Sequence, residues 1–231
     1  MCFNVVALNP RRGGLGFLVD VADWQARYNG NGYSLWAHSP DAYVRTLDYG
    51  EFKAALRGVL SAKIVHYHLR LASSGDISIE NVHMWKVGDY YVSHNGFVSA
   101  YRMGLGNGPS DTYQLVMSDE FREAVEARDW EYLGEVLKEV GFYGVMFLTS
   151  PESVVAVSLH KTVKVHDFGD VLVLSNKRLR KKYYRKWGFR FSRTPPSTSL
   201  MNAIAEVDPR TMMVVRVRRI EVDNPGYFIN Y

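Results

Sequence analysis

The apolar positions of this chain follow two periods, one typical of helices and one typical of strands. In the first 140 residues, short apolar runs alternate with segments whose apolar residues recur every three or four positions. The runs predict strands, and the recurring positions predict helices with one buried face. Strands are expected over residues 3–8, 33–37, 62–68 and 90–93, and helices around 18–25 and over 51–60, 112–117, 119–127 and 129–140.

The second part of the chain consists of β-rich runs separated by turn residues. Strands are expected over residues 143–149, 154–159, 162–165, 171–174 and 212–217, and a surface loop over 194–199. Strands at both ends of the chain with helices between them predict a layered α+β fold. Because no domain boundary stands out, we expect one domain over residues 1–231.

The overall composition is that of an ordinary globular protein, with 231 residues of which 47% are hydrophobic and 23% charged. No apolar run approaches the ~20 residues needed to cross a membrane, and no secretory signal is visible. The single cysteine cannot form an internal disulfide. A cytoplasmic protein with no membrane partner is therefore expected.

Charge is unevenly distributed along the chain. Residues 177–193 carry nine Lys or Arg and no acidic residue, which leaves 19 basic and 24 acidic residues elsewhere. Tyr, Trp and Phe residues interleave with these cations, a pattern that can stack bases and follow phosphates. A solvated segment, or a docking face for an acidic protein, is the simpler interpretation and the one we favour over nucleic-acid binding.

Cys2 is the only cysteine, and it directly follows Met1. Removal of Met1 would leave a thiol and a free α-amine on one residue. An α-amine titrates near ~7.7–8, so at neutral pH it can accept the thiol proton and activate the nucleophile. If Met1 is retained, the amine is part of a peptide bond and this base is absent.

Further candidate chemistry lies between residues 66 and 111. Arg70 ends a predicted strand and could grip a carboxylate with two N–H groups, or could form a surface ion pair. Asn95 and Gly96 could form a hairpin turn or an oxyanion hole. Asp111 starts a predicted helix and could stabilise its first turn or hold a substrate ammonium group. His66 and His68 lack a visible third ligand, so no metal is expected.

Four of these features together resemble the class II glutamine amidotransferases, which are N-terminal-nucleophile hydrolases. The resemblance covers roughly residues 2–175, and residues 28–33 and 79–83 look like segments of the stand-alone members. The matching motifs are Cys2 after Met1, His68-x-Arg70-x-Ala72-Ser73-Ser74-Gly75, His94-Asn95-Gly96 and Ser110-Asp111-Thr112.

The resemblance implies a four-layer αββα sandwich of two mostly antiparallel sheets. It also implies hydrolysis of the glutamine side-chain amide without metal or cofactor. Cys2 would be the nucleophile and its α-amine the base, and Asn95 and Gly96 would stabilise the oxyanion. Arg70 would hold the substrate α-carboxylate and Asp111 its α-ammonium. Ser73 stands where the family has Thr and would contribute its hydroxyl to substrate binding.

Several residues depart from the family pattern without removing a group that makes or breaks bonds. They bear on selectivity for glutamine, and a different γ-amide would also suit them. The departures are Phe3 for Gly, Leu71 for an aromatic residue, Ser74 for His, Tyr113 for Glu, and Met84-Trp85 for Pro-Phe.

The same resemblance raises the questions of what accepts the ammonia and of whether the chain is an enzyme at all. About 55 residues follow position 175, which is too few for a typical synthetase domain. We therefore expect either a separate synthetase chain that receives the ammonia or a simple amidase. The alternative function is a catalytically inactive fold that binds a protein partner or nucleic acid through residues 177–193.

Overall fold

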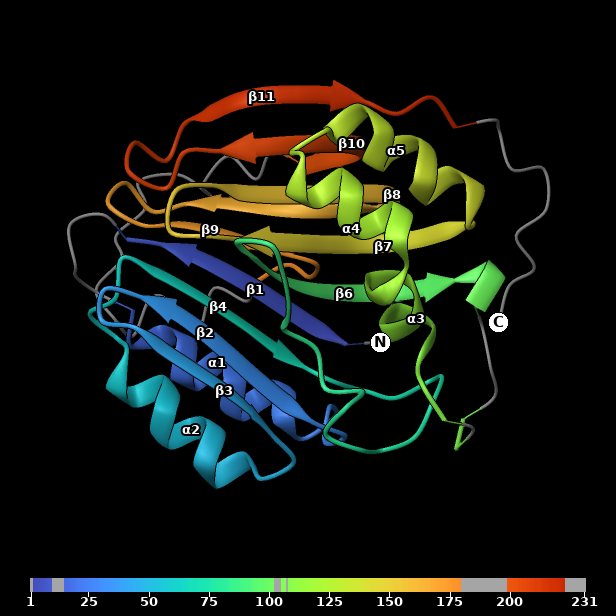
Figure 1. Cartoon of the computed structure of the whole chain (residues 1–231). Helices are drawn as coiled ribbons and strands as arrows, with labels where there is room; N and C mark the ends of the chain where they lie inside the picture. The colour runs from blue at the N-terminus through green and yellow to red at the C-terminus, as the bar shows by residue number, and fades with distance from the viewer. Residues whose placement is uncertain (1, 10–14, 102–104, 107, 180–198, 223–231) are drawn as a thin grey trace.

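A computed structural model of the whole chain, shown in Figure 1, describes residues 2–9, 15–101, 105–106, 108–179 and 199–222. The described strands are β1 (Phe3–Leu8), β2 (Tyr33–His38), β3 (Ala42–Thr46), β4 (Ile64–Leu69), β5 (Trp85–Val87), β6 (Tyr90–Val98), β7 (Phe142–Thr149), β8 (Val154–Asp167), β9 (Leu172–Ser175), β10 (Ser199–Val207) and β11 (Val214–Arg219). The helices are α1 (Phe17–Ala26), α2 (Tyr49–Gly58), α3 (Asp111–Met117), α4 (Asp119–Glu126) and α5 (Trp130–Glu139), and Ser99–Tyr101 form a 3₁₀ turn.

The described strands form one antiparallel sheet in the order β3-β2-β4-β1-β9-β8-β7-β6-β5. Strand β10 pairs with β8, and β11 pairs with β10. Strand β8 pairs with β7 through residues 154–160 and with β9 through residues 164–167. It therefore belongs to both parts of the sheet, which we call the first half (β3, β2, β4, β1, β9) and the second half (β5–β8, β10, β11).

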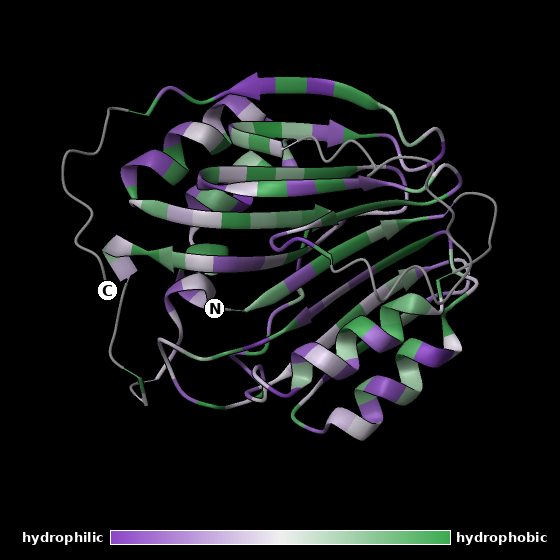
Figure 2. Ribbon diagram, turned by 180° about the vertical axis from the view of Figure 1, so that it is seen from behind, coloured by the Kyte–Doolittle hydropathy of each residue, from purple (hydrophilic) through white to green (hydrophobic). Residues whose placement is uncertain are grey.

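The sheet curls so that its two halves face each other across a buried layer, here called the inner layer. Val6 and Ile64 of the first half pack there against residues of the second half such as Phe147 and Ala156. On the outer faces, α1 and α2 cover the first half, and α3, α4 and α5 cover the second (Figure 1). Figure 2 shows the matching pattern, with largely hydrophobic central strands and helices on which hydrophilic and hydrophobic residues alternate.

Strand β1 shows how the sequence specifies this arrangement. All six residues of its apolar run are buried. Phe3 and Val5 face the helices α1 and α2, whereas Val6 and Leu8 face the inner layer. A strand covered on both faces needs a continuous apolar run instead of an alternating one.

Most of the predicted elements are present, with shifted ends. Helix α2 starts two residues before its predicted range because the Asp48 side chain accepts a hydrogen bond from the Glu51 N–H and caps the helix. Helix α5 ends at Glu139, and Gly141, the predicted stop, follows the C-cap with a positive φ of 64°. Strands β3, β5 and β10 were not predicted.

Four expectations need correction or stay open. The strand over 90–93 does not end at Asn95-Gly96, because β6 continues to Val98. The runs 154–159 and 162–165 form the single strand β8, which is irregular near His160, where φ is 57°. Two separate sheets are not confirmed, since hydrogen bonds join the described strands into one. The assignment of residues 1–231 to one domain stays a prediction.

The structure tests two further expectations only in part. Residues 180–193 of the basic segment and 194–198 of the expected loop lie outside the described residues. Within the described ranges, no helix is both long enough and apolar enough to cross a membrane.

Candidate active site

The Cys2 thiol lies at the start of β1, next to the end of β4. Phe3 pairs with Leu69 in the antiparallel register of these strands, so Cys2 and Arg70 are neighbours just beyond the pair. The half-buried sulfur lies 3.3 Å from the backbone nitrogen of Leu71 and 3.5 Å from its carbonyl oxygen. The thiol can therefore donate to the carbonyl, and the Leu71 N–H can stabilise a thiolate.

The surroundings of Cys2 act on its ionisation in opposite directions. Burial raises the pKa of the Cys2 thiol, whereas the hydrogen bond with Leu71 and the positive charges of Arg70 and Lys177 oppose this shift. Burial has the larger effect. The thiol is consequently protonated at neutral pH, and a reaction at this sulfur needs a base.

Arg70 is buried, with 2% of its surface exposed, and organises the turn that follows β4. Its Nη1 donates to the carbonyl of Asp76 at 2.8 Å, and its Nη2 donates to the carbonyl of Ser74 at 2.9 Å. Burial lowers the pKa of Arg70, and the nearby acidic groups of Cys2, Asp111 and Asp76 oppose this shift. A guanidinium group has five N–H donors, so these two hydrogen bonds use only some of its donors.

The glycine-rich turn over residues 28–33 holds the chain on both sides of Arg70. The Asn29 side chain donates to the Leu69 carbonyl at 3.2 Å, and the Asn31 side chain accepts from the Ala72 N–H at 3.0 Å. Gly32 has a φ of 142°, and a side chain there would clash with Val82. The turn therefore sets the path of the arginine segment.

Asp111 is the first residue of α3, and it is buried. Its Oδ2 accepts from the Val98 N–H and its Oδ1 from the Thr112 N–H, both at 2.8 Å. The Ser74 hydroxyl lies 3.4 Å from the Asp111 backbone nitrogen, whereas Ser73 is exposed. The hydroxyl that contacts Asp111 is therefore that of Ser74.

A second set of contacts fixes the loops around Asp111. The Asn81 side chain accepts from the Ser110 N–H at 2.7 Å and donates to the Gly108 carbonyl at 3.0 Å. Gly75 packs directly against the same backbone, and a Cβ on it would lie 2.6 Å from the Ser110 nitrogen. The arginine turn and the start of α3 thus form one tightly packed unit.

Asn95 and Gly96 lie within β6, where they pair with Val145 and Gly144 of β7. The two strands approach so closely that a Cβ on Gly96 would lie 1.8 Å from the Tyr143 carbonyl oxygen. Asn95 is buried, and its side-chain oxygen has no hydrogen-bond partner among the described residues. A buried amide without a partner is costly unless a ligand or water completes it.

The strand register relates Asn95 to Cys2 across the inner layer. The Ser93 hydroxyl of β6 donates to the Asn4 side chain of β1 at 2.8 Å. Side chains two residues apart on a strand point to the same face, so Cys2 and Asn95 also point toward the inner layer. Because β1 begins and β6 ends on the same side of the molecule (Figure 1), the two residues lie toward the same end of that layer.

Asn176, immediately after β9, is a site residue that the sequence did not indicate. Its side-chain nitrogen donates to the Cys2 carbonyl at 2.9 Å, and its side-chain oxygen accepts from the Asn4 N–H at 2.8 Å. Lys177 follows, with its ammonium group 5.9 Å from the centre of the Phe3 ring. These contacts join positions more than 170 residues apart, and no local pattern marks them.

The chain was compared with known proteins. No family model and no curated protein matches the sequence. Solved structures with the same overall fold do exist. One is glutamine phosphoribosylpyrophosphate amidotransferase from B. subtilis, complexed with ADP and GMP, with a TM-score of 0.57 and 11% identity over 96% of this chain and 50% of that chain.

Two other structures give the same result. The allosteric regulatory enzyme of purine biosynthesis has a TM-score of 0.62 and 14% identity over 96% of this chain and 50% of that one. A glutamine aminotransferase class-II domain protein from Silicibacter pomeroyi has a TM-score of 0.59 and 9% identity over 96% of this chain and all of that one. The fold is that of a class II glutamine amidotransferase domain. The chain spans half the length of the first two proteins, and at such low identity the likeness establishes the fold alone.

Four buried histidines lie next to the candidate site of this amidotransferase fold. Burial lowers the pKa of His66 and of His94 to about 3, and it lowers those of His68 and His83 strongly as well. The rings of His68 and His83 stack with centroids 3.9 Å apart. His66 bonds to Thr149, Ser93 and Asn4 and so fills the middle of the inner layer. The described residues include no group of three or more metal-binding side chains suited to a metal ion.

The predicted site residues thus fall into three groups by their contacts. Cys2 and Arg70 meet at the ends of β1 and β4, and Asp111 is joined to the arginine turn through Ser74. Asn95 and Gly96 face the same end of the inner layer by strand register. Ser73 is exposed and makes no hydrogen bond to this group among the described residues.

Proposed function

We propose that this chain is a glutamine amidotransferase-like amidohydrolase that releases ammonia from the side-chain amide of glutamine or a related γ-amide. The observation that supports it most is the position of the only cysteine, whose sulfur touches Leu71 directly beside the buried Arg70. The amidotransferase fold supports the same proposed function. In the proposal, α1–α2, the two sheet halves and α3–α5 correspond to the four layers expected from the sequence.

The reaction begins with the removal of Met1, which frees the α-amine of Cys2. The amine takes the thiol proton, and the thiolate attacks the amide carbon of the substrate. The Asn95 amide and the Gly96 N–H stabilise the oxyanion, which is the largest electrostatic requirement of acyl transfer. The protonated amine then passes its proton to the departing ammonia. Water hydrolyses the thioester, releases the carboxylic acid and restores the thiol.

Substrate binding uses the charges on either side of this sulfur. Arg70 holds the α-carboxylate with the N–H groups that its own turn leaves over. Asp111 holds the α-ammonium through the negative charge of its carboxylate, whose two oxygens together offer about four acceptor sites. A serine hydroxyl from Ser73 or Ser74 completes the binding site. The ammonia passes to a separate synthetase chain or is released.

The decisive experiment measures ammonia release from a panel of γ-amides, together with the intact mass of the purified protein. We expect mature protein without Met1, activity that is lost in Cys2→Ala, a raised KM in Arg70→Ala, and a kcat lowered about 100-fold in Asn95→Ala, equivalent to ~3 kcal/mol. A thiol-reactive glutamine analogue should label Cys2 in the wild type. Full activity of Cys2→Ala would refute the proposal, and an active protein that retains Met1 would refute the α-amine as base.

The alternative function, binding through residues 177–193, stays a prediction because most of that segment lies outside the described residues. Deleting the segment should weaken salt-sensitive retention on nucleic acid if it binds there. Unchanged retention would remove that idea.

A further inference from the structure

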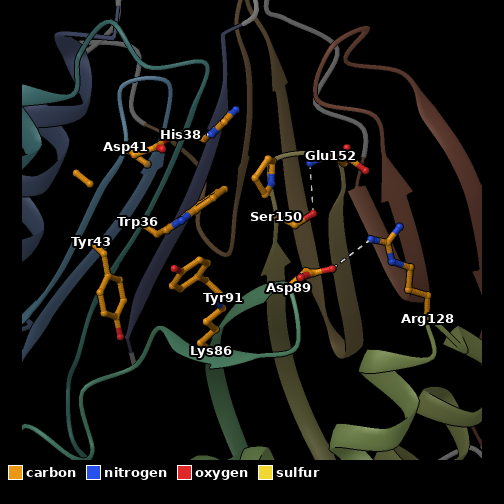
Figure 3. A pocket seen from close by; sticks show the side chains of 13 residues that line it. Trp36, His38, Asp41, Tyr43, Lys86, Asp89, Tyr91, Arg128, Ser150 and Glu152 are labelled. Atoms are coloured by element: carbon orange, nitrogen blue, oxygen red, sulfur yellow. Dashed lines mark hydrogen bonds and ion pairs between the residues drawn. The ribbon is translucent and has the colours of Figure 1, made fainter.

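A second candidate site lies at the opposite end of the inner layer from Cys2. It is a cleft of ≈ 700 Å³ that includes Trp36 and His38 of β2, Tyr91 of β6 and residues 150–152 after β7 (Figure 3). Strand β2 approaches Arg70 at its other end, where Tyr33 pairs with Leu69. The cleft is therefore separate from the candidate active site.

One wall of the cleft is a continuous aromatic surface. The rings of Trp36 and His38 are nearly parallel, at 11°, with centroids 6.4 Å apart. Trp36 also stacks on Tyr91, at 23° and 5.1 Å, and Tyr43 lies 5.2 Å from Tyr91. Trp36 is buried, whereas Tyr43 is 48% exposed and His38 and Tyr91 are half-buried. The open rings, backed by a fixed indole, suit a planar ring as ligand.

Each carboxylate of the cleft has a hydrogen-bond or ion-pair partner. Asp41 accepts from the His38 ring at 3.0 Å and from the Ser39 N–H at 2.9 Å. Asp89 pairs with Arg128 at 3.8 Å, as the dashed line in Figure 3 shows. Glu152, which also lines an adjoining cavity, pairs with Arg210 of that cavity at 3.8 Å.

Lysines leave a small positive excess, because four cations (Arg128, Arg210, Lys86 and Lys63) face the three carboxylates across the cleft and its adjoining cavity. Lys86 lines the cleft, and Lys63 lines the adjoining cavity. Both are exposed, and neither has an ion-pair partner among the described residues. Lys86 stands opposite Tyr91 in the β5–β6 register, so its ammonium group can reach a group attached to a ring stacked on Tyr91. The local electrostatics therefore favour a ligand with negative charge.

We propose that this cleft binds a planar aromatic anion of about the size of a nucleoside monophosphate. The ring stacks on the His38 and Tyr91 side of the cleft, and the anionic group pairs with Lys86. The volume lies within the range of small-molecule sites, ~300–1,000 Å³. The site is independent of the proposed amidase chemistry.

The test uses the full-length protein and ligand-observed NMR, with AMP, adenosine and inorganic phosphate as probes at millimolar concentration. AMP is expected to bind, with adenosine and phosphate each at least about fivefold weaker, because each supplies only one of the two contacts. Absence of AMP binding, or equal affinity for AMP and either fragment, would overturn the proposal.

Matched variants locate the binding. Lys86→Gln should weaken AMP about fivefold and leave adenosine unchanged, whereas Lys138→Gln on the exposed face of α5 should change neither. His38→Ala, at a half-buried ring on the stacking side, should weaken both AMP and adenosine. Cys2→Ala should bind AMP like the wild type, which separates this site from the proposed nucleophile. Wild-type AMP affinity in Lys86→Gln would overturn the proposal even if AMP binds the protein.

Discussion

At the scale of single residues, the candidate nucleophile depends on a side chain from the far end of the sequence. Asn176 bonds to the backbone on both sides of Phe3, through the Cys2 carbonyl and the Asn4 N–H. A terminal residue is otherwise prone to fray. The two hydrogen bonds of the Asn176 side chain therefore fix where the Cys2 sulfur lies relative to Leu71 and Arg70.

Substituting Asn176 should separate its positional role from an electrostatic one. Asn176→Ala loses both bonds and should lower stability by about 1–2 kcal/mol and lower kcat, with little change in the pH profile of Cys2 alkylation. Asn176→Asp keeps the acceptor for Asn4 but adds a negative charge near the thiol, so it should move the alkylation profile to higher pH. Iodoacetamide alkylation and urea unfolding measure these effects. An Asn176→Ala protein with wild-type stability and kcat would contradict the role.

Local motifs were enough to single out several of these residues but not all of them. Arg70 and Asp111 could be selected because each stands at a predicted element end, where a polar side chain has a recognisable use. Asn176 could not, because its two partners lie at the other end of the chain. The contact of Ser74 with Asp111 also depends on a non-local approach, of the arginine turn to α3.

At the scale of elements, β6 shows how pairing overrides a local preference. Asn-Gly is a strong turn signal, yet Asn95 and Gly96 continue the strand. The reason lies in β7, where Gly144 stands opposite Gly96 and lets the two backbones approach. The strands and helices with clear periodicity could be predicted from the sequence, whereas this strand extension, and the union of two runs in β8, depended on partners that no local window contains.

Gly96→Ala tests this close approach. The added Cβ would meet the Tyr143 carbonyl at 1.8 Å and the Gly144 Cα at 2.7 Å, so β7 must move. We expect a loss of more than about 3 kcal/mol in the free energy of unfolding by urea. Gly58→Ala is the control, because nothing lies within 4 Å of its Cβ and a helical alanine should be neutral or stabilising by up to ~1 kcal/mol. Equal stability of the two variants would show that β6 and β7 are not so close.

At the scale of the whole molecule, the inner layer contains a neutral polar centre. His66 occupies its middle, and burial keeps the pKa of that imidazole at about 3. Burial also lowers the pKa of His94 to about 3 and that of His166 to about 4. An unfolded histidine titrates near ~6.5. Below that pH, the unfolded chain therefore binds protons that the folded chain does not.

Stability should accordingly fall on mild acidification. Because the unfolded state takes up the protons, the free energy of unfolding decreases as pH falls below ~6.5, by up to about 1.4 kcal/mol per pH unit for each such histidine. Urea unfolding between pH 7 and 5 measures this slope before most carboxylates titrate. His66→Gln should reduce the slope by up to one proton. A flat profile over that range would contradict the burial of neutral histidines.

The place of β1 in the sheet also has a consequence for biosynthesis. One neighbour of β1 is β4, but the other is β9, whose residues 172–175 are translated much later. At about 5–20 residues per second, the ribosome needs on the order of ten seconds or more to reach them. Throughout that interval β1 of the nascent polypeptide lacks one of its two neighbours, so the edge that later pairs with β9 is open. Under the proposed function, the removal of Met1 can therefore precede the pairing that fixes the position of the thiol.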